Sequence, residues 1–539
     1  MQTDVLIVGA GPVGLTLAVD LGRRGVDCVL IEQKAAPEFL PKMERCNART
    51  MEIFRRMGVI DRVRQSGLPS SVPMDVFIVL AMNEPPLLHL PYPSVDEARA
   101  QIASRNDGTM PREPYQLISQ YTLEPLLKAE AERQPSVRVR YGCRFESLSQ
   151  RPDAVSAIAR DGNGDVVEIE AKYLVGCDGG GSAVRKQLGI KLRGEGDLMR
   201  LYQALYFCPE LYGRLPIGSG PGHGRHYHVS DAQSTFLIMQ DSTQHWTLHA
   251  VVQSPGEMAA QFERTVGVPV RYDMLYVGEW KQNLLLADRY RRGRVFLAGD
   301  SAHLVIPTGG LGMNTGVGDA IDLSWKLAAI LQGWGGPALL DSYEIERRQI
   351  GDRNVGASRY ASLGRRKWRA QYRPEIRDAT PEGRAARAAL ASVADVEQRK
   401  TNEMIGAELG YRYVGSPIIV DEPGGPEHLF REYVPTTWPG ARLPHVWLSD
   451  GVSVHDRIGD GYTLLQLADC DGVRSLPEAM ADVGAPCATL TLSSDAAREV
   501  YGYDLLLVRP DLHVVWRGNR APDNPGEIAR LVTGHANPI

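Results

Sequence analysis

A mostly apolar run followed by a glycine-rich turn near the N-terminus constrains the fold of this chain more than any other feature. Residues 4–8 are rich in β-branched side chains, as in a buried parallel strand. Three glycines follow with GxGxxG spacing: Gly9, Gly11 and Gly14. Apolar residues then recur at helical spacing up to Gly25, and a second apolar run over residues 26–31 leads to Glu32. The pattern predicts a strand, a helix and a second parallel strand.

Each glycine has a different role where such a unit binds a dinucleotide. Gly9 permits the tight turn, Gly11 lets a pyrophosphate approach the backbone, and Gly14 allows the helix to pack closely on the strand. The start of the helix offers free N–H groups to phosphate, and Glu32 lies where an acidic residue binds a ribose hydroxyl pair. The motif alone does not distinguish NAD from FAD.

Two more acidic residues follow predicted strands. Asp178 comes after the apolar run 173–176, and Asp300 comes after the apolar run 294–297. Ligands of α/β proteins bind at the carboxyl ends of parallel strands, although Asp178 could also cap the helix that begins near Ser182. The two acids indicate a ligand with two polar ends that lies along the sheet.

A glycine-rich segment follows Asp300 and leads into a helix predicted over residues 317–331. The N–H groups of residues 311–314 could neutralise a reducible ring near its carbonyls. Three cations, Lys42, Arg45 and Arg49, follow the strand that leads to Glu32. They could contact cofactor phosphates or a ring, or they could form a basic helix start exposed to solvent.

Two segments with strand character, residues 72–105 and 201–252, interrupt the alternating α/β pattern. Aromatic and histidine side chains are frequent in the second segment. Because successive strand residues face opposite sides, we predict His226 and His228 on one face and Tyr227 on the other. One face should pack on a core. The other could line a pocket for a flat, partly polar ring, or it could simply form ordinary aromatic packing.

Composition excludes several classes of function. A chain of 539 residues corresponds to about three domains, and a net charge of −5 argues against a nucleic-acid partner. The seven cysteines are odd in number and contain no CxxC, which favours reduced thiols in the cytoplasm. No apolar stretch approaches the roughly 18 residues of a membrane span, and we expect neither a signal peptide nor a metal site.

The three glycine-rich motifs together resemble those of the single-component, class A FAD-dependent aromatic hydroxylases, also called flavoprotein monooxygenases, in the branch of phenol hydroxylase. The matching segments are GAGPVG at 9–14, CDGGGSAVR at 177–185 and GDSAHLVIPTGGLGMNTGVGDAIDLSWKL at 299–327. The resemblance covers roughly residues 1–360. The tail after the Pro- and Gly-rich segment 422–440 resembles the C-terminal thioredoxin-like domain of that branch but lacks CxxC.

The resemblance implies an α/β fold, α+β overall, with a Rossmann-like FAD domain and an interleaved substrate-binding sheet. The expected domains are an FAD-binding domain at 1–71, 106–195 and 275–360, a substrate-binding sheet at 72–105 and 196–274, a helical connector at 361–421, and a thioredoxin-like domain at 422–539. Relatives of this branch often dimerise through the tail, so a homodimer is possible.

The resemblance also implies roles for individual residues. Glu32 would bind the FAD ribose and Asp300 the ribityl chain, Asp178 would support both FAD and NAD(P)H, and Pro307 would lie beside the flavin C4a. Many relatives have Arg where this chain has Lys42, so either Lys42 or Arg45 would contact the flavin. The expected cofactor-binding residues are Gly9, Gly11, Pro12, Val13, Gly14, Glu32, Gln33, Lys42, Arg45, Gln120, Asp178, Asp300, Pro307, Gly310, Leu311, Gly312, Met313 and Asn314. The catalytic candidates are Pro307, His249 and Tyr227.

The implied activity is hydroxylation of a small aromatic, phenolic substrate with FAD, NADPH or NADH, and O2, through a flavin C4a-hydroperoxide. The cofactor carries this chemistry, so a catalytic base need not stand out in the sequence. One alternative is a tailoring oxygenase or epoxidase that acts on a polycyclic natural product. Another is a non-catalytic FAD-binding sensor or carrier, although the complete nicotinamide-associated motif around Asp178 argues against it.

Overall fold

The predicted N-terminal unit forms the centre of a parallel sheet, in a computed structural model that describes residues 1–216 and 219–536. β1 leads through α1 (Pro12–Arg23) into β2. The parallel strands lie in the order β19 (Val295–Leu297), β10 (Val166–Gly176), β1 (Gln2–Val8), β2 (Cys28–Ile31) and β7 (Val137–Arg140). The strands β2, β10 and β19 therefore end at one edge of the sheet, where Glu32, Asp178 and Asp300 follow them.

A β-hairpin extends this sheet. β8 (Arg144–Gln150) pairs with β9 (Val155–Arg160), which pairs with β10. The apolar run 173–176 is only the last part of β10, which is continuous from Val166 to Gly176. Its polar residues keep their pairing, because Glu170 lies opposite both Gln2 and Ser156.

A seven-stranded, mostly antiparallel sheet forms the second layer. Its order is β16 (Asp273–Lys281), β12 (Arg200–Phe207), β15 (His245–Ala250), β14 (Phe236–Met239), β13 (His226–Val229), β4 (Val76–Val79) and β5 (Leu88–Leu90). Segments 72–105 and 196–274 thus join in one sheet, because β4 pairs with β13 in parallel. The expected boundary at residue 274 is wrong, since it divides β16.

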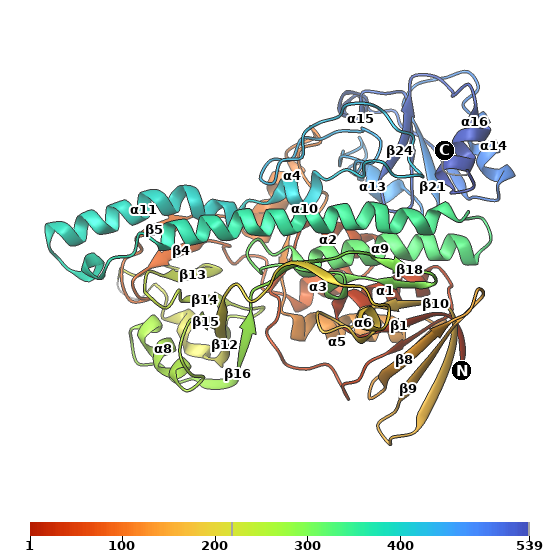
Figure 1. Ribbon diagram of the computed structural model, residues 1–539. Helices are drawn as coiled ribbons and strands as arrows, with labels where there is room; N and C mark the ends of the chain where they lie inside the picture. The colour runs from red at the N-terminus through yellow and green to blue at the C-terminus, as the bar shows by residue number, and fades with distance from the viewer. Residues whose placement is uncertain (217–218, 537–539) are drawn as a thin grey trace.

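Long helices connect the two sheets. They are α9 (Gly312–Leu331), α10 (Ala338–Arg369) and α11 (Pro381–Asn402). In Figure 1, α10 runs from the parallel sheet to the seven-stranded sheet and packs along α11. The boundary expected at residue 360 is also wrong, because it falls inside α10.

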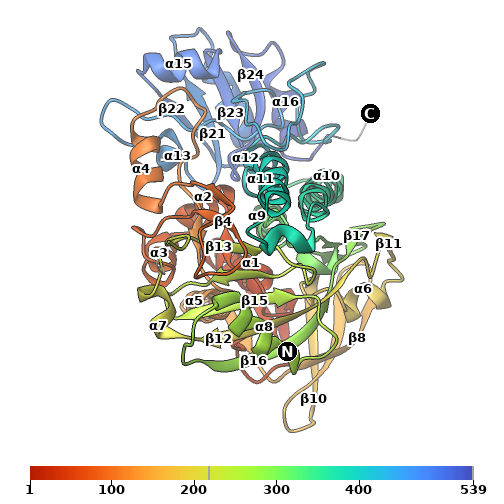
Figure 2. The same ribbon diagram turned by 90° about the vertical axis from the view of Figure 1, so that its left-hand side faces the viewer.

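The C-terminal domain has the expected thioredoxin-like alternation of strands and helices. Its sheet has the order β22 (Cys487–Thr491), β21 (Tyr462–Gln466), β23 (Leu505–Val508) and β24 (Val514–Gly518). The helices α14 (Ser475–Asp482), α15 (Asp495–Tyr501) and α16 (Pro525–Val532) connect and flank these strands. Figure 2 shows this domain against the long helices, on the side away from the seven-stranded sheet.

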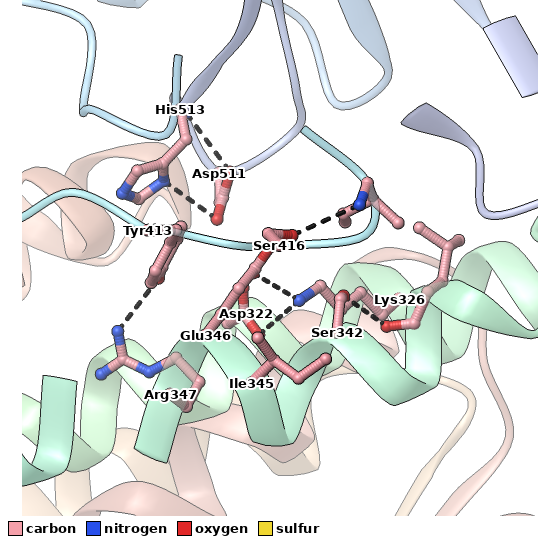
Figure 3. Close-up of polar contacts among 12 residues, drawn as sticks. Asp322, Lys326, Ser342, Ile345, Glu346, Arg347, Tyr413, Ser416, Asp511 and His513 are labelled. Atoms are coloured by element: carbon pink, nitrogen blue, oxygen red, sulfur yellow. Dashed lines mark hydrogen bonds and ion pairs between the residues drawn. The ribbon is translucent and has the colours of Figure 1, made fainter. Parts of the chain in front are cut away.

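A buried ionic cluster joins this domain to α9 and α10, and Figure 3 shows four of its members, Asp322, Lys326, Glu346 and Asp511. Arg509, next to β23, binds Glu346 of α10 at 2.8 Å and Asp322 of α9 at 3.0 Å. Lys326 donates to both of these carboxylates, at 2.8 and 2.7 Å. Asp511 completes the cluster, because its Oδ1 pairs with Arg509 Nε at 2.7 Å. All five side chains are almost completely buried.

The remaining elements are short segments around these layers: β3 (Arg45–Cys46), α2 (Ala48–Arg56), α3 (Ile60–Ser66), α4 (Val95–Ala103), β6 (Gln116–Leu117), α5 (Gln120–Glu132), α6 (Ala183–Gln187), β11 (Leu192–Glu195), α7 (Pro209–Gly213), α8 (Glu257–Val266), β17 (Leu284–Ala287), β18 (Arg291–Arg292), η1 (Gly299–Ser301), β20 (His303–Leu304), η2 (Pro374–Arg377), α12 (Ile405–Leu409) and α13 (Val454–Arg457). Within residues 1–216 and 219–536, no helix has the length and apolar character that a membrane crossing needs.

Candidate active site

A cavity of about 860 Å³ extends from the carboxyl edge of the parallel sheet to one face of the seven-stranded sheet. Most of the predicted site residues line it: Gly9, Gly11, Pro12, Val13, Glu32, Gln33, Lys42, Arg45, Gln120, Asp178, His249, Asp300, Pro307, Gly310, Gly312, Met313 and Asn314. Three predicted residues lie outside its lining, namely Gly14, Leu311 and Tyr227.

The turn after β1 depends on contacts that only glycine permits. Gly9 has a φ of +108°, and a Cβ at Gly14 would lie 2.0 Å from the carbonyl oxygen of Gly9. Gly14 therefore serves close packing, as predicted, and does not face the cavity. A Cβ at Gly11 would meet no atom within 4 Å, so this position is open to an approaching ligand. Among the described residues, no side chain caps the start of α1, and its free N–H groups suit a phosphate.

Glu32 is held in place by two backbone donors. Its two carboxylate oxygens accept hydrogen bonds from the N–H groups of Ala10, at 2.9 Å, and Lys34, at 3.0 Å. A carboxylate oxygen can accept more than one hydrogen bond. The group therefore retains acceptor capacity toward the cavity for a pair of ribose hydroxyls.

Asp178 combines the two roles considered from the sequence. Its carboxylate accepts from Ser182 Oγ at 2.5 Å and from the N–H of Val184 at 3.1 Å, so it supports the start of α6. It also lines the cavity. The N-cap residue of α6 is Ser182, whose side chain accepts from the N–H of Arg185, and Asp178 supports it by accepting from Ser182 and from a second N–H of the first turn. The contact of Asp178 to cofactors stays a prediction.

Asp300 differs from Asp178 because its carboxylate forms no hydrogen bond with any residue of the described chain. It faces the cavity, and the N–H of Gly299 donates to buried Asp319 at 3.0 Å, which fixes the turn. Burial raises the pKa of Asp300, against the effects of His303 and Lys42. A hydroxyl donor from a ligand would satisfy this carboxylate.

The start of α9 contributes Gly312, Met313 and Asn314 to the cavity lining, after Gly310 of the preceding turn. Gly309 and Gly310 have φ values of +94° and +66°, and this turn leads the chain into the helix. The Asn314 side chain accepts from the N–H of Asn47 at 2.9 Å and donates to Gly310 O at 2.6 Å. Leu311 is buried in a small apolar cluster. The free N–H groups of the first turn therefore carry the predicted anion-binding capacity.

Lys42 and Arg45 have different environments. Arg45 is buried and donates to Gly309 O at 3.0 Å and to Glu408 at 3.1 Å. It thereby supports the turn that precedes α9. Lys42 is exposed, lines the cavity and acts electrostatically on Asp300. Of these two cations, Lys42 is therefore the one whose side chain can move to contact a bound ligand.

The inner face of the seven-stranded sheet forms the other end of the cavity. Its lining side chains include Gln203, Phe236, Ile238, His249 and Trp280. Gln203 and Phe236 are both cross-strand partners of His249, and the rings of Phe236 and His249 stack at 4.4 Å. The predicted alternation is confirmed here, because one face of the sheet lines a pocket that contains aromatic rings.

His249 lies at the cavity but is poorly suited to act as a base. Trp280 Nε1 donates to His249 Nδ1 at 3.2 Å. This hydrogen bond assigns the imidazole proton to Nε2 in the neutral ring. Burial lowers the pKa of His249 to about 3. His249 is therefore a neutral ring whose Nε2 lies 3.4 Å from the side-chain amide nitrogen of Gln203, and its Nε2–H can donate to a ligand oxygen that replaces this contact.

A carboxylate–histidine pair, which the sequence did not reveal, also lines the cavity. Glu44 accepts from His226 Nε2 at 2.9 Å. Burial lowers the pKa of His226 to about 4, although Glu44 opposes that shift. At neutral pH the pair therefore consists of a carboxylate and a neutral imidazole.

The structure does not support Tyr227 as a catalytic residue. Its ring is fully buried on the outer face of the sheet, in the apolar cluster with Trp246 and Leu248. Its hydroxyl donates to Gly222 O at 2.9 Å and accepts from the N–H of Gly224 at 2.8 Å. The alternation along β13 directs Tyr227 away from the cavity, as it directs His226 toward it.

Family models match both parts of the chain. A model described as FAD binding domain matches residues 2–358, and a model described as aromatic-ring hydroxylase, C-terminal, matches residues 436–536. The chain belongs to the FAD-dependent aromatic-ring hydroxylases.

Individual relatives agree with this assignment. The hydroxylase is 34% identical to the FAD-dependent monooxygenase apdD of Emericella nidulans, over 98% of this chain and 90% of the relative. It is 32% identical to aklavinone 12-hydroxylase RdmE of Streptomyces purpurascens, over 96% of each. A structure of chromopyrrolic acid-soaked RebC with bound 7-carboxy-K252c superposes with a TM-score of 0.90 at 33% identity, over 99% of this chain and 100% of that one.

The hydroxylase is thus an oxidoreductase that uses FAD, with NAD(P)H and O2 as co-substrates. Its cavity fits FAD, because open space at Gly11, acceptor capacity at Glu32 and an unpartnered carboxylate at Asp300 follow one another along the sheet edge. The non-catalytic alternative has no support among these relatives.

Sequence reasoning missed several residues of the cavity: Glu44, Gln203, Phe236, Ile238, Trp280 and Arg365. None belongs to a motif with recognisable spacing. The alternation of β14 could have indicated Phe236 and Ile238, since it predicts one inward-facing set.

Proposed function

We propose that this hydroxylase inserts one oxygen atom of O2 into an aromatic ring bound between the start of α9 and the inner face of the seven-stranded sheet. The stacked pair of Phe236 and His249 on this face carries the proposal. An apolar and aromatic wall binds a flat ring and excludes water, while FAD supplies the oxygen-transfer chemistry when bound.

The residues of this chain would bind and orient the two ring systems. The glycine turn and Glu32 would hold the adenosine end of FAD, and Asp300 would accept from its sugar-alcohol chain. The first N–H groups of α9 would face the flavin ring, with Pro307 beside them. His249 Nε2–H would donate to an oxygen substituent of the substrate.

We propose a substrate larger than a single phenol ring. The lining side chains come from five neighbouring strands, β16, β12, β15, β14 and β13. Four spacings of about 4.8 Å separate these strands, so the wall extends over roughly 19 Å. This width favours the polycyclic alternative, and relatives named for aklavinone hydroxylation agree with it.

The test is turnover with NADPH or NADH under ¹⁸O2, using a panel of hydroxylated one-ring to four-ring arenes. We expect substrate-dependent NAD(P)H oxidation and a product that carries one ¹⁸O atom, with the highest kcat/KM for a multi-ring compound. His249→Phe should lower the coupling of NAD(P)H oxidation to product. Production of H2O2 alone with every arene would contradict the proposal.

We further propose a cytoplasmic homodimer. All seven cysteines are unpaired, which fits a reducing compartment. Light scattering of the purified protein tests the dimer, and cell fractionation tests the location.

A further inference from the structure

Arg365 is a cation in the cavity that has no protein partner. It lies near the C-terminal end of α10 and lines the cavity beside the inner face of the seven-stranded sheet. Its guanidinium carbon lies 5.1 Å from the ring centroid of Phe236. Among residues 1–216 and 219–536, no side chain or carbonyl forms a hydrogen bond or ion pair with it, and its Nε is buried without a partner.

The neighbouring arginines have partners. Arg45 binds Glu408, and Arg369, one turn further along α10, donates to Val229 O and Thr235 O at 3.2 and 2.9 Å. Arg225 lies within 3.4 Å of His226 Nδ1. Arg365 is therefore an exception among the cations on this side of the cavity.

The protein offers little negative charge to balance Arg365. Glu44 is the carboxylate that acts on it electrostatically, but Glu44 already accepts from His226. Burial, followed by the charge of Arg369, lowers the pKa of Arg365 to about 9. A buried charge is costly unless it is paired, so a ligand group that pairs with Arg365 gains a strong interaction.

The position of Arg365 indicates which ligand would supply that group. The residues around it, Phe236, His226 and Glu44, belong to the sheet end of the cavity. Glu32 and Asp300, which would hold FAD, lie at the other end, along the parallel sheet. The group therefore belongs to the aromatic substrate.

We propose that Arg365 binds an anionic oxygen substituent of the substrate, so that the preferred substrates are acid-bearing aromatic compounds. This inference rests on the proposed function. The planar guanidinium matches a carboxylate in bidentate geometry, and an ionised phenol offers the same chemistry through one oxygen. The ring would lie on the Phe236–His249 wall with its acidic group directed toward α10.

Calorimetric binding to the oxidised, FAD-loaded enzyme, without NAD(P)H, tests the proposal independently of turnover. The probes are 3-hydroxy-2-naphthoate, with a carboxylate, 2,4-dinitro-1-naphthol, which is an ionised phenol at neutral pH, and uncharged 2-naphthol. We expect the enzyme to bind at least one anion more tightly than 2-naphthol. Arg365→Gln should weaken the binding of that anion by about 10- to 100-fold, the usual effect of losing a charge-assisted hydrogen bond. The affinity for 2-naphthol should stay within about twofold.

Two further variants separate charge from structure. Arg365→Lys keeps the charge and should restore part of the affinity for the anion. Arg366→Gln makes the same change at the exposed neighbouring residue and should leave all three affinities unchanged. The FAD content of each variant should equal that of the unsubstituted enzyme, because Arg365 lies at the sheet end of the cavity.

The outcomes distinguish this inference from the proposed function. If Arg365→Gln changes all three affinities alike, or if the enzyme binds neither anion more tightly than 2-naphthol, the inference is wrong. If the anion preference depends on Arg365 but no arene yields an ¹⁸O-labelled product, the inference holds and the proposed hydroxylation fails.

Discussion

Single side chains at the FAD end of the cavity differ in whether the protein itself uses them. Asp178 accepts hydrogen bonds from Ser182 and Val184, whereas the carboxylate of Asp300 faces the cavity and has no partner in the described chain. Asp178 therefore stabilises the start of α6, and its contact to a cofactor stays a prediction. For Asp300 we predict a role in FAD binding without a role in folding.

Asp300→Asn should separate FAD affinity from stability. The variant loses a charged acceptor, so we expect FAD to bind about 10-fold more weakly. The Asp300 side chain is exposed to the cavity and has no hydrogen-bond or ion-pair partner among the described residues, so its charge adds no contact that stabilises the folded apoprotein. The apoprotein should therefore be as stable as before. Flavin fluorescence titration measures the FAD affinity, and thermal melts of the apoprotein measure its stability. As a comparison, Asp178→Ala removes a hydrogen-bond acceptor from the start of α6 and should lower the melting temperature.

The glycines of the first turn should also respond differently to the same substitution. Gly14→Ala places a Cβ 2.0 Å from Gly9 O, and we expect a loss of at least about 1–3 kcal/mol in the free energy of unfolding. Gly11→Ala meets no protein atom, so it should keep the stability of the apoprotein but weaken FAD binding. Denaturant unfolding of both apoproteins measures the two losses of stability. Equal destabilisation would contradict a packing role for Gly14 and a ligand-approach role for Gly11.

At the scale of elements, the seven-stranded sheet separates two functions by the alternation of its residues. The inner face supplies His226, Phe236 and His249 to the cavity, and the outer face supplies Tyr227 and Trp246 to an apolar core. A substitution on one face should therefore affect binding, and one on the other face should affect stability.

Tyr227→Phe tests this separation. The variant loses the hydrogen bonds to Gly222 O and from the Gly224 N–H, and we expect a loss of about 1–2 kcal/mol in the free energy of unfolding. The KM and kcat for an accepted arene should stay within about twofold. A large loss of kcat with unchanged stability would restore Tyr227 as a catalytic candidate.

At the scale of the whole molecule, a buried ionic cluster, part of which Figure 3 shows, joins the C-terminal domain to α9 and α10. Arg509 contacts Asp322, Glu346 and Asp511. Arg509→Met removes a cation and leaves buried carboxylates without one of their partners. We expect a loss of about 3–5 kcal/mol in the free energy of unfolding, measured by denaturant titration with tryptophan fluorescence. The surface variant Arg520→Met, at an exposed ion pair, is the matched control.

The same cluster should make stability depend on pH. Its core holds three carboxylates, of Asp322, Glu346 and Asp511, and two cations, of Lys326 and Arg509. Burial raises the pKa of Asp322, although Lys326 opposes the shift and Glu346 adds to it.

Between the usual pKa of an unfolded aspartate, about 4, and the higher pKa in the folded protein, the folded state binds more protons than the unfolded state. The contribution of Asp322 to stability therefore decreases as pH rises through this interval. Asp322→Asn mimics the protonated form and should flatten the decrease in the free energy of unfolding with rising pH, as followed by denaturant titration. An unchanged slope would contradict the assignment of the proton to Asp322.

The FAD end of the site could be predicted from the sequence because each of its parts is contiguous in the chain. A strand, a tight turn and a helix start require particular residues within a few positions, so Gly9 to Gly14, Glu32, Asp178 and Asp300 carried recognisable spacing. The parallel sheet then brought the three acids to one edge, since its strands run in one direction.

Only the tertiary structure showed which residues line the substrate end of the cavity. Glu44, Phe236, Trp280 and Arg365 come from a loop, two strands and a helix that are far apart in sequence, and no local spacing requires them to meet. Whether Arg365 has a partner depends on how α10 lies against the sheet, which long-range packing sets. The sequence by itself therefore determined a dinucleotide-type βαβ unit with acidic residues after three strands, because these features depend on local spacing. The packing of α10 against the seven-stranded sheet decided which side chains meet at the substrate end of the cavity, because that packing joins residues far apart in the chain.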